Sequence, residues 1–129
     1  MESVRTQVVI IGAGPAGLLL GHLLERDGID TVILESRSLD YVQHRVRAGV
    51  IEYGIANFLE DAGVGSRMRL EGLVHHGIEF RVEGQSHRIA LSDLYDGHAI
   101  TVYGQQELVK DLIEARVASG APIRFDATV

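Results

Sequence analysis

The stretch Val8-Val9-Ile10-Ile11-Gly12-Ala13-Gly14-Pro15-Ala16-Gly17-Leu18 decides the fold, because a strand, a glycine turn and the start of a helix follow one another within it. No polar residue alternates with the apolar run Val8–Ile11, which predicts a parallel strand buried on both faces. The helix ends near Gly28, and Thr31–Leu34 forms a second short apolar run. We therefore predict an α/β fold with a Rossmann-type βαβ unit and a parallel sheet.

The three glycines have the G-x-G-x-x-G spacing of a dinucleotide-binding turn. In that turn Gly12 allows a sharp change of direction, Gly14 admits a pyrophosphate to the backbone, and Gly17 lets the helix lie close to the sheet. Glu35 follows Gly17 by 18 positions, at the end of the second strand, where a carboxylate accepts hydrogen bonds from ribose hydroxyls. Taken singly, a structural turn and an ordinary surface glutamate remain the alternatives.

Periodicity and turn residues predict the remaining elements. Ser36–Gly49 has no clear period, so we expect mostly loop with at most one helical turn. Two strands around the residues Glu83–Ser86 predict a small β-hairpin. The expected elements are a helix over Ile51–Ala62, hairpin strands over Gly77–Val82 and His87–Leu91, a strand over Ala99–Tyr103, a helix from Gln105 with Leu108, Val109, Leu112, Ile113 and Val117 turned inward, and a strand over Ile123–Phe125.

Arg45 and Arg47 lie two positions apart in a segment expected to be extended, where such side chains project to the same side. Two guanidinium groups would then converge on one anion, such as a pyrophosphate or a second nucleotide. Ala48 and Gly49 follow, and their small size lets a planar ring approach the backbone. From the spacing alone, a surface arginine pair that bridges carboxylates is the favoured interpretation.

Composition excludes several classes of protein. The net charge of −6 argues against a dedicated nucleic-acid binder, and the absence of cysteine excludes disulfides and fits a reducing compartment. No run of about 20 apolar residues predicts a membrane span, and the start of the chain does not resemble a signal peptide, so we expect a cytoplasmic protein. The adjacent His75 and His76 have no further ligand at metal spacing, so no metal is predicted; His75 is a packed histidine or a buried proton carrier.

Four stretches together, Ile10–Leu18, His44–Val50, Gly72–His75 and Thr101–Gln105, resemble the 4-hydroxybenzoate 3-monooxygenase family of class A, FAD-dependent aromatic hydroxylases. The resemblance implies that residues 1–129 are the N-terminal portion of a longer enzyme, an incomplete FAD-binding domain that is inactive alone. The parent would hydroxylate 4-hydroxybenzoate to 3,4-dihydroxybenzoate with FAD, NADPH or NADH, and oxygen, and could form a homodimer. Its partners would be an aromatic small molecule and oxygen, with no nucleic acid or membrane. A non-catalytic FAD- or ADP-binding fragment and another FAD-dependent oxidoreductase stay open as alternatives.

The resemblance also implies roles for single residues. Members that use NADPH carry arginine directly after the ribose glutamate; this position is Ser36 here, with Arg37 next, so NADPH and NADH both remain open. His75 matches the inner end of a proton relay to the substrate phenol. The implied FAD contacts are Gly12, Gly14, Ala16, Gly17, Glu35, Arg45, Val46, Arg47, Ala48, Gly49, Val50 and Gln105, and those to the nicotinamide nucleotide are Arg37, Tyr41, Arg45 and Arg47.

Overall fold

The computed structural model describes residues 5–129, which form two compact units. The first unit consists of residues 5–47 and 105–129, and the second unit of residues 48–104. Each unit is described by itself. Within residues 5–129, no helix has the length and apolar character that a membrane span requires.

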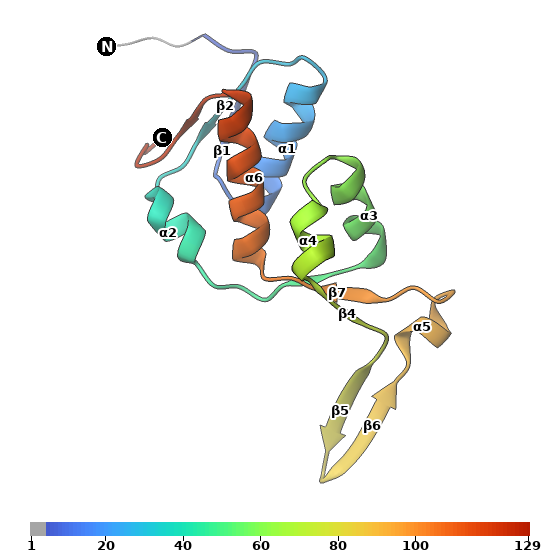
Figure 1. Ribbon diagram of the computed structural model, residues 1–129. Helices are drawn as coiled ribbons and strands as arrows, with labels where there is room; N and C mark the ends of the chain where they lie inside the picture. The colour runs from blue at the N-terminus through green and yellow to red at the C-terminus, as the bar shows by residue number, and fades with distance from the viewer. Residues whose placement is uncertain (1–4) are drawn as a thin grey trace. The chain divides into compact units, whose positions relative to one another are not determined.

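The first unit is built on a three-stranded parallel sheet in the order β1-β2-β8. Helices α1 and α6 pack against each other and α1 packs on the sheet, while the short α2 packs against α6 (Figure 1). This arrangement confirms the predicted βαβ unit and its parallel pairing. The elements are β1 (Val8–Ile11), α1 (Pro15–Arg26), β2 (Thr31–Leu34), α2 (Leu39–His44), α6 (Gln105–Ser119) and β8 (Ile123–Arg124).

The prediction that the first strand is buried on both faces is wrong. β1 is an edge strand of this sheet, with Ile10 buried but Val9 52% and Ile11 63% exposed. Val9 and Ile11 alternate with Ile10 along the strand, so they lie on the opposite face of the sheet from Ile10. The central strand β2, which lies between β1 and β8, has the burial expected of a parallel strand: Thr31, Val32 and Ile33 are all buried.

A buried arginine occupies the core of the first unit. Arg116 is 1% exposed and donates hydrogen bonds to the Thr31 hydroxyl (2.8 Å), the Thr31 carbonyl (2.7 Å) and the Pro122 carbonyl (2.8 Å). Its guanidinium also lies 3.6 Å from the Glu25 carboxylate. The prediction that Val117 points inward is wrong, because the buried positions 109, 112, 113 and 116 follow the helical period and leave Val117 65% exposed.

The segment expected to be mostly loop contains the six-residue helix α2. The Ser38 hydroxyl caps it by accepting a hydrogen bond from the Tyr41 N–H at 3.2 Å. The helix therefore fixes the direction in which Tyr41 and the following arginines leave the backbone.

The second unit contains an antiparallel sheet in the order β3-β7-β4. Ile51 pairs with Thr101 in this sheet, so its prediction as a helical residue is wrong, and the helix begins only at Tyr53. A Cβ at Gly49 would overlap the carbonyl oxygen of Tyr103, which explains the glycine there. The elements are β3 (Val50–Ile51), α3 (Tyr53–Asp61), α4 (Ser66–Glu71), β4 (Leu73–His75), α5 (Leu91–Leu94) and β7 (Ile100–Val102).

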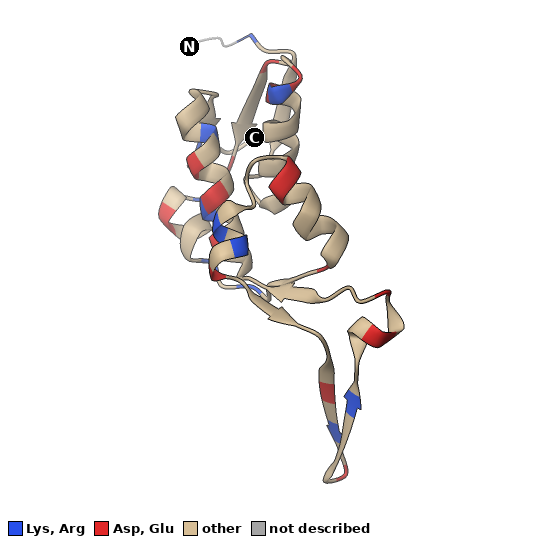
Figure 2. Cartoon of the chain, turned by 45° about the vertical axis from the view of Figure 1, so that its right-hand side comes forward, with Lys and Arg blue, Asp and Glu red and all other residues tan. Residues whose placement is uncertain are grey.

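The predicted hairpin is present as β5 (Ile78–Val82) and β6 (Gln85–Ile89), but its turn is shorter than expected. Only Glu83 and Gly84 connect the strands, and both have positive φ (51° and 77°), as in a two-residue hairpin turn. Both strands are exposed along their whole length. The hairpin carries charged side chains of both signs (Figure 2).

Candidate functional site

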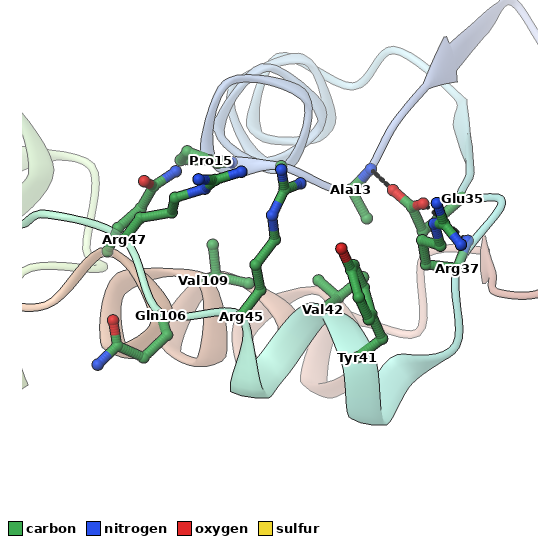
Figure 3. A pocket seen from close by; sticks show the side chains of 12 residues that line it. Ala13, Pro15, Glu35, Arg37, Tyr41, Val42, Arg45, Arg47, Gln106 and Val109 are labelled. Carbon is green, nitrogen blue, oxygen red and sulfur yellow. Dashed lines mark hydrogen bonds between the residues drawn. The ribbon is translucent and has the colours of Figure 1, made fainter.

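A cavity of about 320 Å³ opens in the first unit where β1 and β2 end. The glycine turn, the end of β2, helix α2 with the segment after it, and the start of α6 form its walls (Figure 3). A crevice at the carboxyl ends of parallel strands is the usual ligand site of such sheets. The residues that line it are Ala13, Gly14, Pro15, Glu35, Arg37, Tyr41, Val42, Arg45, Arg47, Gln105, Gln106 and Val109.

The three positions of the turn are occupied by glycine for different structural reasons. Gly12 has a φ of +106°, which other residues rarely adopt, and a Cβ at Gly17 would overlap the carbonyl oxygen of Gly12. A Cβ at Gly14, by contrast, would meet no protein atom within 4 Å, and Gly14 lines the cavity. The protein itself therefore does not require glycine at position 14, and the missing side chain leaves space for a ligand beside the α1 N-terminus, whose N–H groups favour an anion.

Glu35 lies beside the glycine turn and accepts hydrogen bonds from the N–H groups of Ala13 and Arg37, both at 2.8 Å, and from the Ser36 hydroxyl at 3.3 Å. Partial burial is the largest single influence on the Glu35 pKa and raises it. The hydrogen bonds from Ala13, Arg37 and Ser36 together outweigh that effect, so the pKa is held below its ordinary value. The side chain is thus a carboxylate at neutral pH, with lone pairs left for ligand hydroxyls.

Three guanidinium groups and only one carboxylate line the cavity, so it is positive in a protein whose net charge is negative. The Tyr41 ring lies between two of them, 5.2 Å from Arg37 and 5.9 Å from Arg45. Arg45 and Arg47 extend toward the glycine turn (Figure 3). No carboxylate of residues 5–129 bridges either arginine, so the geometry favours an anion site over the surface-bridge interpretation.

The structure brings seven of the predicted site residues to this cavity and leaves the others elsewhere. His75 is exposed at the end of β4, rather than buried as the sequence suggested, and its role as a proton relay stays a prediction. Within residues 5–129 no group of three or more metal-type ligands comes together. The cavity residues are Gly14, Glu35, Arg37, Tyr41, Arg45, Arg47 and Gln105, whereas Gly12, Ala16, Gly17 and Val46 do not line it, and Ala48, Gly49, Val50 and His75 belong to the second unit.

Five lining residues were not predicted as site residues. Ala13 and Pro15 lie inside the glycine turn that was recognised, so the motif itself contained the signal. Val42 was missed because α2 was expected to be loop; the Ser38 cap and the acidic Asp40 in the first turn were the available signals. Gln106 and Val109 follow Gln105 on α6. The sequence predicted Val109 only as an inward-facing helical residue and gave no signal for Gln106.

These observations define a class of protein. A glycine turn joins a parallel strand to a helix, a carboxylate closes the next strand, and arginines line the crevice at the strand ends. The first unit is therefore a dinucleotide-binding α/β unit.

A family model described as FAD binding domain matches residues 5–129, and the chain belongs to that family. The cofactor of the family is FAD. The chain is 51% identical over 120 residues to the p-hydroxybenzoate hydroxylase of Acinetobacter baylyi and 30% identical over 118 residues to the 6-methylpretetramide 4-monooxygenase of Streptomyces rimosus. These matches cover 93% and 88% of the chain, which spans 30% and 27% of the two relatives.

Solved structures show the same fold. The p-nitrophenol 4-monooxygenase PnpA of Pseudomonas putida superposes with a TM-score of 0.78 over 98% of this chain and 33% of its own, at 22% identity. At that identity the likeness supports the α/β fold with its parallel sheet.

Proposed function

We propose that this chain holds the FAD of an aromatic monooxygenase that converts 4-hydroxybenzoate to 3,4-dihydroxybenzoate with NADPH or NADH and oxygen, in the cytoplasm. The observation that carries the proposal is the positive cavity at the glycine turn, in a chain 51% identical to a p-hydroxybenzoate hydroxylase. Bound FAD supplies the redox and oxygen-transfer chemistry, and the protein supplies binding and position. The domain would be the N-terminal portion of the enzyme.

The cavity residues fit FAD in chemical type. The Glu35 carboxylate accepts hydrogen bonds from the adenosine ribose hydroxyls. The open space at Gly14 and the α1 N-terminus admit the pyrophosphate, whose two negative charges are balanced by Arg45 and Arg47. Gln105 would contact the cofactor from the first position of α6.

The nicotinamide nucleotide would use the cation-rich side of the same cavity. The guanidinium groups of Arg37 and Arg45 both lie over the Tyr41 ring there, so two planar cations are available to a phosphate. Ser36 replaces the arginine typical of NADPH-using members, so a 2′-phosphate would depend on Arg37. We further propose, on the resemblance, that Arg45–Val50 line the pyrophosphate, ribityl and flavin-ring side of FAD and that His75 relays the substrate proton.

FAD binding is tested by Gly14→Val, titrating FAD into the chain and following quenching of flavin fluorescence. We expect affinity to fall about a hundredfold, equal to about 2.7 kcal/mol, because the valine fills the space for the pyrophosphate. Gly54→Val is the matched control, since its added side chain faces only the flexible end of Glu52 in the second unit. Equal FAD affinities for wild type and Gly14→Val would contradict the site.

The activity is tested in a chimera in which this chain replaces the segment of the Acinetobacter enzyme that matches it. We expect 4-hydroxybenzoate to be hydroxylated, with NAD(P)H consumed in step with the product. The two coenzymes compared side by side decide between NADPH and NADH. A chimera that binds FAD but forms no 3,4-dihydroxybenzoate would favour the non-catalytic FAD-binding alternative.

A further inference from the structure

Gln106, the second residue of α6, has a polar atom without a partner. Its side-chain Oε1 is buried and accepts no hydrogen bond from any of residues 5–129, although the residue lines the cavity. A buried carbonyl oxygen that has lost water without gaining a donor is destabilising, and such groups are rare in native proteins. A donor on a ligand in the cavity would satisfy it.

The place of Gln106 within the cavity indicates which part of a ligand it meets. Glu35 and Arg37 lie at one end of the cavity, and Arg47 and Gln106 lie at the other (Figure 3). This step rests on the proposed function, in which Glu35 takes the adenosine ribose of FAD. The far end then takes the part of the cofactor beyond the pyrophosphate, which is the ribityl chain.

The chemistry of the two neighbouring FAD groups differs. Pyrophosphate oxygens only accept hydrogen bonds at neutral pH, whereas ribityl hydroxyls also donate them. We propose that the Oε1 of Gln106 accepts a hydrogen bond from a ribityl hydroxyl of FAD, so that this residue selects FAD over ligands that end at the pyrophosphate.

One rearrangement of the same side chain gives a different contact. A carboxamide turned by 180° presents its Nε2, which would donate to the pyrophosphate instead. Glutamate in place of Gln106 keeps an acceptor and removes the donor, and leucine removes both. The two substitutions therefore distinguish a hydroxyl partner from a phosphate partner.

The test measures dissociation constants for FAD and ADP with wild type, Gln106→Leu and Gln106→Glu. We expect Gln106→Leu to weaken FAD about tenfold and ADP less than about twofold, since ADP lacks the ribityl chain. Gln106→Glu should keep the wild-type ratio of FAD to ADP affinity, because charge repulsion from the pyrophosphate affects both ligands alike. Gln43→Leu, on α2 outside the cavity lining, is the control and should change neither constant.

Thermal unfolding without ligand separates folding from binding. Gln106→Leu should melt at or above the wild-type temperature, because the unpaired oxygen is gone. Equal losses of FAD and ADP affinity would overturn the ribityl assignment in favour of a phosphate contact, and unchanged FAD affinity would overturn any contact. A wild-type chain that binds ADP but not FAD, or neither, would instead count against the proposed function.

Discussion

The two units use their apolar and charged residues in opposite ways. The first unit buries a charged residue, Arg116, among backbone carbonyls and places its arginines around a cavity. The second unit contains the β5–β6 hairpin, whose apolar residues are all exposed. The comparison teaches that hydrophobicity alone does not locate the core or the site of this chain. A buried charged side chain marks the core of the first unit, and arginines around a cavity mark its site.

The hairpin is amphipathic, so it has an apolar face that could be buried, although both of its strands are exposed. Its register places Ile78 opposite Ile89 and Phe80 opposite His87 on one face, while Glu79 pairs with Arg88 on the other. Helix α6 of the first unit, by contrast, has a buried face made of Val109, Leu112, Ile113 and Arg116, and the helix packs against α1. An isolated two-stranded hairpin is marginally stable in water, so the second unit should be the weaker part of this chain.

The largest expected effect is the loss of the buried arginine. Arg116→Met would leave the Thr31 carbonyl unpaired, the Pro122 carbonyl with only the Ile33 N–H as donor, and Glu25 without its cation. We expect it to lower the free energy of unfolding by about 3–5 kcal/mol. Urea denaturation followed by circular dichroism measures this.

Arg69→Met in the second unit is the matched control. Arg69 pairs with Glu60 at 2.7 Å, but both side chains are substantially exposed, so we expect a loss of about 0–1 kcal/mol. Equal losses for the two variants would break the comparison between a buried and a surface arginine.

A smaller effect is expected at Glu35, and it depends on pH. Because the folded pKa of Glu35 is below its unfolded value, the carboxylate stabilises the fold above the unfolded pKa, about 4.3, and this contribution is lost as pH falls through the folded pKa. Glu35→Gln should therefore lower stability at pH 7 by about 0.5–1 kcal/mol, since the group is partly exposed.

The pH profile is the diagnostic measurement for Glu35. Unfolding of wild type and Glu35→Gln is followed from pH 7 to pH 2, and the difference should shrink below about pH 4. Asp40→Asn, whose carboxylate lies on the exposed surface of α2, controls for the general loss of negative charge. A stability difference between wild type and Glu35→Gln that stays constant down to pH 2 would contradict the role of the three hydrogen bonds.

The glycine turn, Glu35 and the parallel pairing were predictable because each follows from local sequence: a β-branched run, fixed glycine spacing and a strand end. The buried Arg116 was not, because only the fold shows that Thr31 and Pro122 bring their carbonyls to one point beside α6. The edge position of β1 could not be predicted from the sequence for a similar reason. An apolar run predicts what can be buried, while the neighbouring strands and helices decide what is.

Within the site, the arginine pair shows where spacing stops being informative. A separation of two positions between Arg45 and Arg47 fits both an anion site and a surface bridge. Only the structure places both arginines on a cavity, with no ion pair to a carboxylate among residues 5–129. Gln106 had no signal at all, since its distinguishing feature is a missing partner in three dimensions. At Gly49 the sequence suggested space for a planar ring, but the structure gives a reason within the protein. A Cβ at Gly49 would overlap the Tyr103 carbonyl, so the glycine is explained without a ligand.

The smallest effect is expected in the hairpin. Phe80 is 50% exposed and lies opposite His87 in a hairpin whose two strands are exposed, so Phe80→Ser should change the free energy of unfolding by less than about 0.5 kcal/mol. Leu59→Ala, in the same unit but 1% exposed, should cost about 2–5 kcal/mol and shows that the assay detects a buried loss. If Phe80→Ser cost as much as Leu59→Ala, the apolar face of the hairpin would be covered in solution, and the contrast between the two units would rest on α6 and Arg116 alone.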